Sequence, residues 1–253
     1  MLMTGVKEKA MAKLILLRHG QSLWNALNKF TSWVDVPLSE RGRAEATVVS
    51  CQLRDAGYCI DVCFTSMLIR AIETAIVCLS ECNEVRCGKI PVLQHDEDDL
   101  NWHHWSQSDA VPFQELPIFP AVALDERYYG ELQGKNKAEM AQKYGAEQLH
   151  IWRRSFSEGP PGGESLEEAS QRTIPYLSNC ILPYVRQGKN ALVVAHSNSL
   201  RAIIMKLEQL TPAEIPKVEL KTGVPIVYDI NAEGQVINKL VLKPSHDELL
   251  DVV

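Results

Sequence analysis

The chain has 253 residues, long enough for one large domain whose core needs no disulfide support. Hydrophobic residues make up 45% of it and charged residues 23%, an ordinary globular composition that excludes a coiled coil, a collagen or bulk disorder. The net charge of −6 argues against a nucleic-acid binder, so any anion site must be built locally from a few basic residues.

The sequence also bears on location and metal binding. No apolar run approaches the roughly 20 residues that span a bilayer, and the first residues lack the apolar segment of a secretory signal. The seven cysteines form no CxxC pair, which predicts a cytoplasmic protein with reduced thiols. One group of cysteines and histidines has the wrong spacing for a zinc finger or ribbon, so we expect no metal site. That group is Cys78, Cys82, Cys87, His95, His103 and His104.

The first third of the chain alternates short apolar strands with amphipathic helices. Residues 14–17 predict a buried strand that leads directly into RHG, and residues 62–64 predict a second that ends in TS. Between them a helix is expected after Ser39, which is a good N-cap. A second helix is predicted over residues 66–79, followed by a weaker strand at 91–93.

Two stretches interrupt this alternation. Residues 94–121 are long and irregular with an acidic run, and a connection of this kind is usually a functional lid or a disordered insertion. Residues 158–163 read EGPPGG and predict a loop. We expect residues 1–253 to form a single domain in which 1–12 and 245–253 are loose tails.

The remaining elements continue the pattern. A long helix over 165–186 contains two prolines, which predict a kink or a split. A buried strand at 191–195 ends in HSNS and precedes a helix over 200–207. A short helix is expected after Thr211, and a weaker strand at 224–230. This alternation predicts an α/β fold with three αβα layers, in which helices cover both faces of a mostly parallel central sheet.

Two of the predicted strands end in a histidine. LILLRHG brings His19 to the end of the first strand, and ALVVAHS brings His196 to the end of another. Because ligands of open α/β sheets bind outside the carboxyl ends of the strands, the two imidazoles are expected to meet there. A lone histidine is more often a satisfied, half-buried residue, but the shared topological position favours a functional pair.

Arginines accompany these strand ends. Arg18 precedes His19, Arg70 lies one turn into the helix after 62–64, and Arg153 with Arg154 forms a basic pair. Guanidinium groups match phosphate oxygens bidentately, although each arginine alone is as well explained by a surface ion pair. A neutral histidine among arginines can attack phosphorus, because flanking positive charge lowers its pKa. A carboxylic acid must then move the proton, and composition does not identify which one.

Seven sequence blocks in order resemble the histidine phosphatase superfamily, and within it the family of cofactor-dependent phosphoglycerate mutases. They cover most of residues 13–230, and ERYYGELQGKNKAE is typical of the mutase branch. The blocks are LLRHGQSLWN, FTSWVDVPLSERG, FTSMLIRAIETA, LDERYYGELQGKNKAEMAQKYG, WRRSF, VVAHSNSLRAI and TGVPIVYDI. The resemblance implies interconversion of 3-phosphoglycerate and 2-phosphoglycerate through a phosphohistidine primed by 2,3-bisphosphoglycerate, without a metal.

The resemblance also implies roles for individual residues. His19 would be the phosphorylated nucleophile and Glu126 the general acid and base. Arg18, Arg70 and His196 would surround the transferred phosphoryl group. Asn25 would also bind the substrate, by a hydrogen bond to that phosphoryl group. The residues expected to bind the substrate's carboxylate and second phosphate are Ser22, Thr31, Ser32, Tyr129, Lys137, Arg153, Arg154 and Asn198. Relatives form dimers or tetramers, so we expect a homo-oligomer whose other partners are small phosphoglycerates.

Several positions depart from the family pattern. Ser32 stands where the mutases usually have glycine, as in related bisphosphoglycerate mutases, and its hydroxyl is expected to favour phosphatase or synthase side activity unless the exchange is simply tolerated. Ser197 replaces a usual glycine and would be strained if its φ were positive. Asp125 replaces a usual asparagine, and its carboxylate is expected to raise the pKa of Glu126.

Larger differences keep two other functions open. The segment 94–121 is longer than the family's connection, the loop after Arg154 is shorter than in many relatives, and DELLDVV stands in place of a lysine-rich tail. A bisphosphoglycerate mutase or phosphatase on the same scaffold is one alternative, which Ser32 motivates. A catalytically silent protein that binds a phosphorylated ligand is the other, which Ser197 and the insertion motivate.

Overall fold

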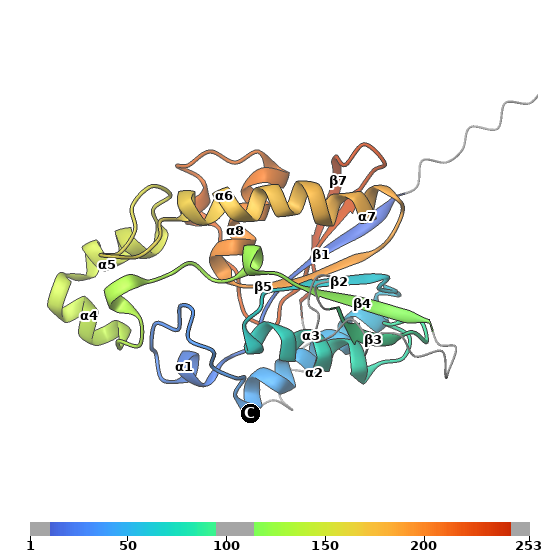
Figure 1. Cartoon of the computed structure of the whole chain (residues 1–253), viewed down its shortest axis with the longest axis horizontal. Coiled ribbons are helices and arrows are strands. Elements are labelled where there is room, and N and C mark those ends of the chain that lie inside the picture. Colours follow the sequence, from blue (N-terminus) through green and yellow to red (C-terminus); the bar gives the residue numbers. More distant parts are fainter. Residues whose placement is uncertain (1–10, 95–113, 244–253) are drawn as a thin grey trace, which may run out of the picture.

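The computed structural model describes residues 11–94 and 114–243, in which a central sheet carries helices on both faces (Figure 1). The strand order is β3-β4-β2-β5-β1-β6-β7, with parallel pairing from β3 to β1 and antiparallel pairing of β6 and β7 at one edge. The strands are β1 (Ala12–Arg18), β2 (Val62–Thr65), β3 (Ile90–Leu93), β4 (Glu115–Pro120), β5 (Ala191–Ala195), β6 (Ile226–Ile230) and β7 (Val236–Val241). The predicted α/β fold with a mostly parallel sheet is therefore confirmed.

Sequence signals explain where several helices begin. The Ser39 hydroxyl accepts a hydrogen bond from the Gly42 amide at 3.1 Å and so caps α2. Ser165 and Glu168 form a capping box at the start of α6. The helices are α1 (Leu23–Ala26), α2 (Glu40–Asp55), α3 (Ile69–Glu81), α4 (Lys137–Tyr144), α5 (Ala146–Arg154), α6 (Leu166–Tyr176), α7 (Leu182–Arg186) and α8 (Ser197–Glu208).

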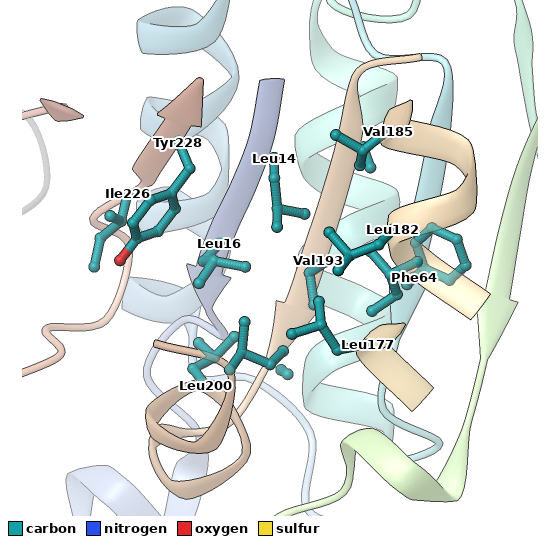
Figure 2. Packing of buried hydrophobic residues seen from close by; sticks show 14 of the residues in the cluster. Leu14, Leu16, Phe64, Leu177, Leu182, Val185, Val193, Leu200, Ile226 and Tyr228 are labelled. Carbon is teal, nitrogen blue, oxygen red and sulfur yellow. The ribbon is translucent and has the colours of Figure 1, made fainter. Parts of the chain in front are cut away.

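The alternating residues of β1 show why both faces of the sheet are covered. Leu14 and Leu16 join a cluster with residues of α7 and α8, part of which Figure 2 shows. Ile15 and Leu17 join a cluster with residues of α2 and α3 on the opposite face. All four side chains are at most 1% exposed. Because each side chain from Leu14 to Leu17 packs into an apolar layer, this part of the strand reads as an unbroken hydrophobic run.

The elements agree with the sequence in most places and differ in some. The weaker strand candidates are confirmed as β3 and β6, and the kink expected in 165–186 is a π-helical turn over Leu177–Ile181. The strands β4 and β7 and the helices α1, α4 and α5 were not predicted. β4 lies inside the segment expected to be irregular, because its two prolines obscured a strand that pairs with both β2 and β3. The rest of that segment (95–113) and most of the expected tails 1–12 and 245–253 lie outside the described residues. The first tail was predicted too long, because Ala12 is buried and begins β1.

Three helix predictions differ from the structure: two in the residue where the helix begins and one in the kind of structure formed. α3 begins at Ile69 rather than at Ser66, whose side chain serves a different purpose described below. α8 begins at Ser197, three residues before the predicted start. After Thr211 there is a turn held by Glu214 and then a 3₁₀ turn over Ile215–Lys217 rather than an α-helix.

The expectation of reduced thiols throughout was wrong for one pair. Cys59 and Cys87 form a disulfide with their Cα atoms 5.7 Å apart, and the other five cysteines are free. The start of β2 meets the loop after α3 here, where the Ile60 amide donates to the Val85 carbonyl at 2.7 Å. This proximity is tertiary, so cysteine spacing could not reveal it. Among the described residues, none of the helices has the length and apolar character needed to cross a bilayer.

Candidate active site

Three strand ends bring the polar residues of the site together. In the sheet register Arg18 of β1 lies beside Ala195 of β5, and Thr65 of β2 lies beside Val194. The residues that follow these strands, His19, His196 and Ser66, therefore emerge at one edge of the sheet. The rings of His19 and His196 are 4.8 Å apart, centroid to centroid, and meet edge to face. The structure therefore brings the two imidazoles into contact, as the sequence predicted.

The glycine of RHG allows α2 to approach this edge. A Cβ atom on Gly20 would lie 2.3 Å from the carbonyl oxygen of Gly42, and a Cβ on Gly42 would lie 2.1 Å from that of Gln21. Both distances are far inside van der Waals contact, so neither position has room for a side chain. The two glycines let the start of α2 lie directly against the loop that carries His19.

The environment of His19 keeps its imidazole neutral. Its pKa is well below the ordinary value, first because the ring is buried and then because Arg70 and Arg18 repel a positive charge. Nδ1 lies 2.7 Å from the carbonyl oxygen of Gly20, which can only accept, so Nδ1 carries the proton. This leaves the lone pair on Nε2, as a nucleophile requires.

A hydrogen-bonded chain orients His196. Its Nε2 donates to the hydroxyl of Ser66 at 2.8 Å, and that hydroxyl donates to Oδ1 of Asp125 at 2.6 Å. Burial and then the charge of Arg70 lower the pKa of His196 well below its ordinary value. Nδ1 of His196 is buried without a hydrogen-bond partner among the described residues, and in this tautomer it can only accept a hydrogen bond.

Backbone carbonyls fix the arginines beside the histidines. Arg70 donates to the carbonyls of Ser32 at 2.8 Å and Val34 at 2.9 Å, and Arg18 donates to the carbonyl of Leu220 at 2.8 Å. In each guanidinium the Nε atom is buried without a hydrogen-bond partner in the described part of the chain. Buried donors without partners are costly, so this arrangement is suited to an anion that accepts from them.

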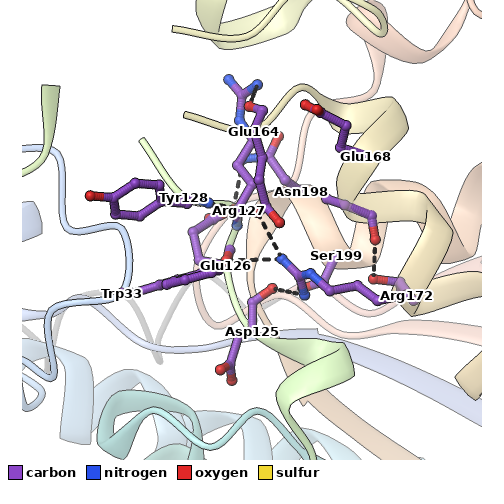
Figure 3. A network of polar contacts seen from close by, with 12 residues as sticks. Trp33, Asp125, Glu126, Arg127, Tyr128, Glu164, Glu168, Arg172, Asn198 and Ser199 are labelled. Carbon is purple, nitrogen blue, oxygen red and sulfur yellow. Dashed lines mark hydrogen bonds and ion pairs between the residues drawn. The ribbon is translucent and has the colours of Figure 1, made fainter. Parts of the chain in front are cut away.

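A second network holds Glu126 at the mouth of the site (Figure 3). Its Oε1 accepts from the Asn198 amide nitrogen at 2.7 Å and from the Arg127 backbone at 2.9 Å. Its backbone carbonyl accepts from the indole nitrogen of Trp33 at 2.5 Å and from Arg172 at 3.2 Å. The carboxylate is therefore positioned both through its own oxygens and through the loop that carries it.

One cavity at the sheet edge collects most of the predicted site residues. It is lined by seven cationic side chains and only two carboxylates, a local excess of five positive charges in a protein of net charge −6. Burial, followed by repulsion from Arg153 and Arg18, lowers the pKa of Lys137 there to about 8. The predicted residues that line it are Arg18, His19, Asn25, Thr31, Ser32, Arg70, Glu126, Tyr129, Lys137, Arg153, Arg154 and Asn198. The geometry is that of a site for a small, highly charged anion.

Comparison with known proteins agrees with this geometry. A model of the histidine phosphatase superfamily (branch 1) matches residues 14–110 and 107–243. The chain belongs to this superfamily.

Curated relatives within the superfamily are close in sequence. A 2,3-bisphosphoglycerate-dependent phosphoglycerate mutase 1 of Gloeobacter violaceus is 62% identical over 92% of this chain and 99% of its own. A similarly named protein of Protochlamydia amoebophila is 51% identical over 89% of this chain and 98% of its own. One of Arabidopsis thaliana is 46% identical over 92% of this chain and 68% of its own.

Solved structures share the fold at lower sequence identity. A protein described as mycobacterial hydrolase 1 has a TM-score of 0.68 at 19% identity, over 92% of this chain and all of its own. A mycobacterial glucosyl-3-phosphoglycerate phosphatase in complex with VO3 has a TM-score of 0.68 at 20% identity, over 91% of this chain and 97% of its own. At these sequence identities, the comparison with solved structures shows a shared fold and nothing about activity.

Two predicted residues of this superfamily member do not line the cavity. Ser22 is fully buried, and its side chain caps α1 by accepting from the Asn25 amide at 3.1 Å, while Asn25 Oδ1 accepts from the Ser22 amide. It therefore orients Asn25 and is not in position to touch a ligand in this cavity. His196 contacts the ring of His19 edge to face but does not itself line the cavity.

Sequence reasoning missed other contributors. Ser66 was taken only as the start of a helix, whereas its hydroxyl joins His196 to Asp125. The Asp125 carboxylate also accepts from the Met67 amide at 2.8 Å, so it is turned toward the end of β2 and not toward Glu126 as expected. Arg201 could have been found, because it follows Asn198 by three residues and so shares its face of α8. The other missed lining residues are Lys29, Phe30, Ser197, Glu219 and Leu220.

Backbone strain is found at Ser32 and not at Ser197. Ser197 begins α8 and does not have positive φ, so the anticipated strain is absent there. Ser32 is buried with a φ of 53°, in the left-handed region that favours glycine. Its hydroxyl accepts from the Tyr129 amide at 2.8 Å, which joins this loop to the loop of Glu126.

No cluster of three or more metal-ligating side chains (His, Cys, Asp or Glu) is found within residues 11–94 and 114–243.

Proposed function

We propose that the protein is a 2,3-bisphosphoglycerate-dependent phosphoglycerate mutase that interconverts 3-phosphoglycerate and 2-phosphoglycerate. The observation that carries the proposal is the neutral His19, paired with His196 in a cavity whose lining has an excess of five positive charges. A bisphosphorylated glycerate carries a carboxylate and two phosphates, roughly four to five negative charges near pH 7. The names of relatives that are 46–62% identical direct the proposal to phosphoglycerates.

The residues present fit 2,3-bisphosphoglycerate as the priming group. Several buried polar atoms near the histidines have no partner among the described residues, and all of them could bond to phosphate oxygens. They are Arg18 Nε, Thr31 Oγ1, Arg70 Nε and Arg154 Nη1. When bound, 2,3-bisphosphoglycerate supplies the phosphoryl group that makes His19 a phosphohistidine.

Each residue then has a definite task in phosphoryl transfer. Nε2 of His19 forms a bond to phosphorus as the bond between phosphorus and the substrate oxygen breaks. Glu126, as the carboxylic acid, donates its proton to that oxygen, and in the return step its carboxylate takes the proton from the attacking hydroxyl. Arg18 and Arg70 stabilise the charge on the other phosphoryl oxygens, which is the main requirement of this reaction. His196 packs edge to face against His19 and holds that ring in place.

The experiment couples product formation to enolase, with and without added 2,3-bisphosphoglycerate. We expect turnover of 3-phosphoglycerate that rises on priming, and an acid-labile, base-stable label on His19 from radiolabelled bisphosphoglycerate. His19→Ala is expected to lose both turnover and label, because it removes the nitrogen that accepts the phosphoryl group. Retained turnover in that variant would contradict the assignment of the nucleophile.

The strained Ser32 favours one alternative, a bisphosphoglycerate mutase or phosphatase on the same scaffold. Its buried hydroxyl lines the cavity and is able to orient a water molecule toward phosphorus. Inorganic phosphate measured alongside this assay distinguishes the two functions, since a phosphatase releases it in proportion to the bisphosphoglycerate consumed. The silent phospholigand-binding alternative predicts tight binding without any label on His19. A homo-oligomeric state and a cytoplasmic location stay predictions.

A further inference from the structure

Three consecutive residues, 218–220, each hold one arginine of the cavity. The arginines come from different elements: Arg18 from the end of β1, Arg154 from the end of α5 and Arg201 from α8. The contacts are Arg201 Nε to the carbonyl oxygen of Val218 at 3.0 Å, Arg154 Nη2 to Glu219 Oε1 at 2.7 Å and Arg18 Nη1 to the carbonyl oxygen of Leu220 at 2.8 Å. This short segment thus fixes the spacing of three positive charges at one side of the site.

The contact to Arg154 differs from the other two. Arg18 and Arg201 donate to backbone carbonyls, which cannot move without the chain, whereas Arg154 is held by a carboxylate on a flexible side chain. The side chain of Glu219 is 70% exposed and that of Arg154 only 19%, so the pair spans the rim of the cavity. Nη1 of Arg154 is buried and without a partner among the described residues. Arg154 is therefore only partly satisfied, and its present counter-ion is free to swing into solvent.

We infer that Glu219 is a specificity-determining residue: it serves as a displaceable counter-ion of Arg154 and discriminates against the more highly charged ligand. An anion that binds Arg154 must either displace the carboxylate of Glu219 or lie beside it. In both cases the repulsion grows with the charge of the anion. Glu219 therefore weakens binding of bisphosphoglycerate more than binding of a monophosphoglycerate. The choice of these two ligands rests on the proposed function.

This discrimination matters for a site that must bind both species in turn. Without Glu219, the local excess of positive charge would hold the bisphosphate more firmly than the monophosphate. A carboxylate at the rim reduces that difference while leaving the buried arginines near the histidines unchanged. Glu126, the other carboxylate of the lining, already bonds to Asn198, so Glu219 is the one free to play this part among the described lining residues.

The test compares Glu219→Gln with the matched control Glu84→Gln. Glutamine keeps the size and one acceptor oxygen of Glu219 and removes its charge. Glu84 is exposed on the loop between α3 and β3, at the amino ends of the strands, and does not line the cavity, so its variant changes net charge by the same amount. Dissociation constants for 2,3-bisphosphoglycerate and 3-phosphoglycerate are measured by isothermal titration calorimetry at low and at high salt.

We expect Glu219→Gln to bind bisphosphoglycerate roughly three- to fivefold more tightly, the upper part of the range for an exposed ion pair, with a smaller gain for 3-phosphoglycerate. The gain should shrink at high salt, and Glu84→Gln should show neither change. Unaltered affinity in Glu219→Gln, an equal gain for both ligands, or the same gain in the control overturns the inference.

A second pair of probes separates this inference from the proposed function. If the wild-type protein binds neither phosphoglycerate, the proposed function is wrong, and inorganic pyrophosphate and phosphate are titrated instead. Glu219→Gln should then still tighten pyrophosphate more than phosphate, which supports the inference about Arg154. Absence of that difference overturns it independently of the substrate.

Discussion

At the scale of single residues, the site depends on which atom of each side chain is already occupied. Nδ1 of His19 donates a hydrogen bond to the carbonyl of Gly20. Nε2 of His196 donates to Ser66, whose hydroxyl donates to Asp125. His19 is therefore left with the lone pair of Nε2 for chemistry, and His196 is fixed in one orientation beside it. Ser32 contributes in a similar way, because its hydroxyl is bonded to Tyr129 and its carbonyl to Arg70.

Substitutions of Ser32 separate its backbone strain from its hydrogen bond. Ser32→Ala loses the bond to Tyr129 and keeps the left-handed backbone, so we expect a loss of about 1 kcal/mol in the free energy of unfolding. Ser32→Gly loses the same bond but relieves a strain of about 1 kcal/mol, so its stability should stay near that of the wild type. Urea unfolding of the two variants measures the difference.

The same two variants test the side activity of Ser32. Both lack the hydroxyl, and both are expected to show a lower ratio of phosphatase to mutase activity than the wild type. An unchanged ratio in either one would exclude a role of the hydroxyl in side activity and leave Ser32 as a tolerated exchange for glycine.

At the scale of elements, the site is assembled by joining segments that are distant in sequence. The disulfide between Cys59 and Cys87 ties the start of β2 to the loop after α3, and so closes the unit that carries Ser66 and Arg70. The ion pair of Lys89 with Asp61, at 2.6 Å, lies at the same junction. The disulfide and the ion pair hold the segment together near the amino end of β2, and the site residues Ser66 and Arg70 follow its carboxyl end.

Thiol titration tests the disulfide. The denatured, unreduced protein should react with Ellman's reagent at five thiols and the reduced protein at seven, since five cysteines are free. Cys59→Ser should lower the free energy of unfolding by roughly 3–4 kcal/mol under oxidising conditions, the entropy expected for a closed loop of 28 residues. Under reducing conditions the variant and the wild type should become nearly equal. Seven reactive thiols without reductant would show that the pair is not bonded.

At the scale of the whole molecule, an acidic protein surrounds a strongly cationic cavity. The buried, neutral histidines link this electrostatic arrangement to folding stability. The pKa values of His19 and His196 are lowered in the folded state, mainly by burial. The unfolded chain therefore binds more protons below the ordinary histidine pKa of about 6.5, and stability falls as the pH drops through that value.

The pH dependence of unfolding measures this link. Each neutral, buried histidine should cost about 1.4 kcal/mol of stability per pH unit below 6.5, so urea midpoints should fall between pH 6.5 and 5.5. His19→Gln should show a shallower fall, because one of the two groups is removed. Equal slopes in the variant and the wild type would mean that His19 titrates in the folded protein as it does in the unfolded chain.

Local patterns determined much of this protein from the sequence alone. The apolar runs that became β1, β2 and β5 are buried on both faces, so their hydrophobicity had to be continuous and could be recognised without a structure. The caps at Ser39 and Ser165 are contacts within three residues, which a sequence displays directly. The histidines were predictable for the same reason, since each follows its strand immediately.

The tertiary structure alone decided the features that join distant segments. The bonds from Ser66 to Asp125 and from Arg154 to Glu219, and the disulfide at Cys59, join residues that are 28 or more positions apart. No periodicity relates such pairs, because they meet only after the sheet register and the packing of helices are fixed. The same holds for the left-handed backbone of Ser32, which the bonds to Tyr129 and Arg70 maintain against its local preference.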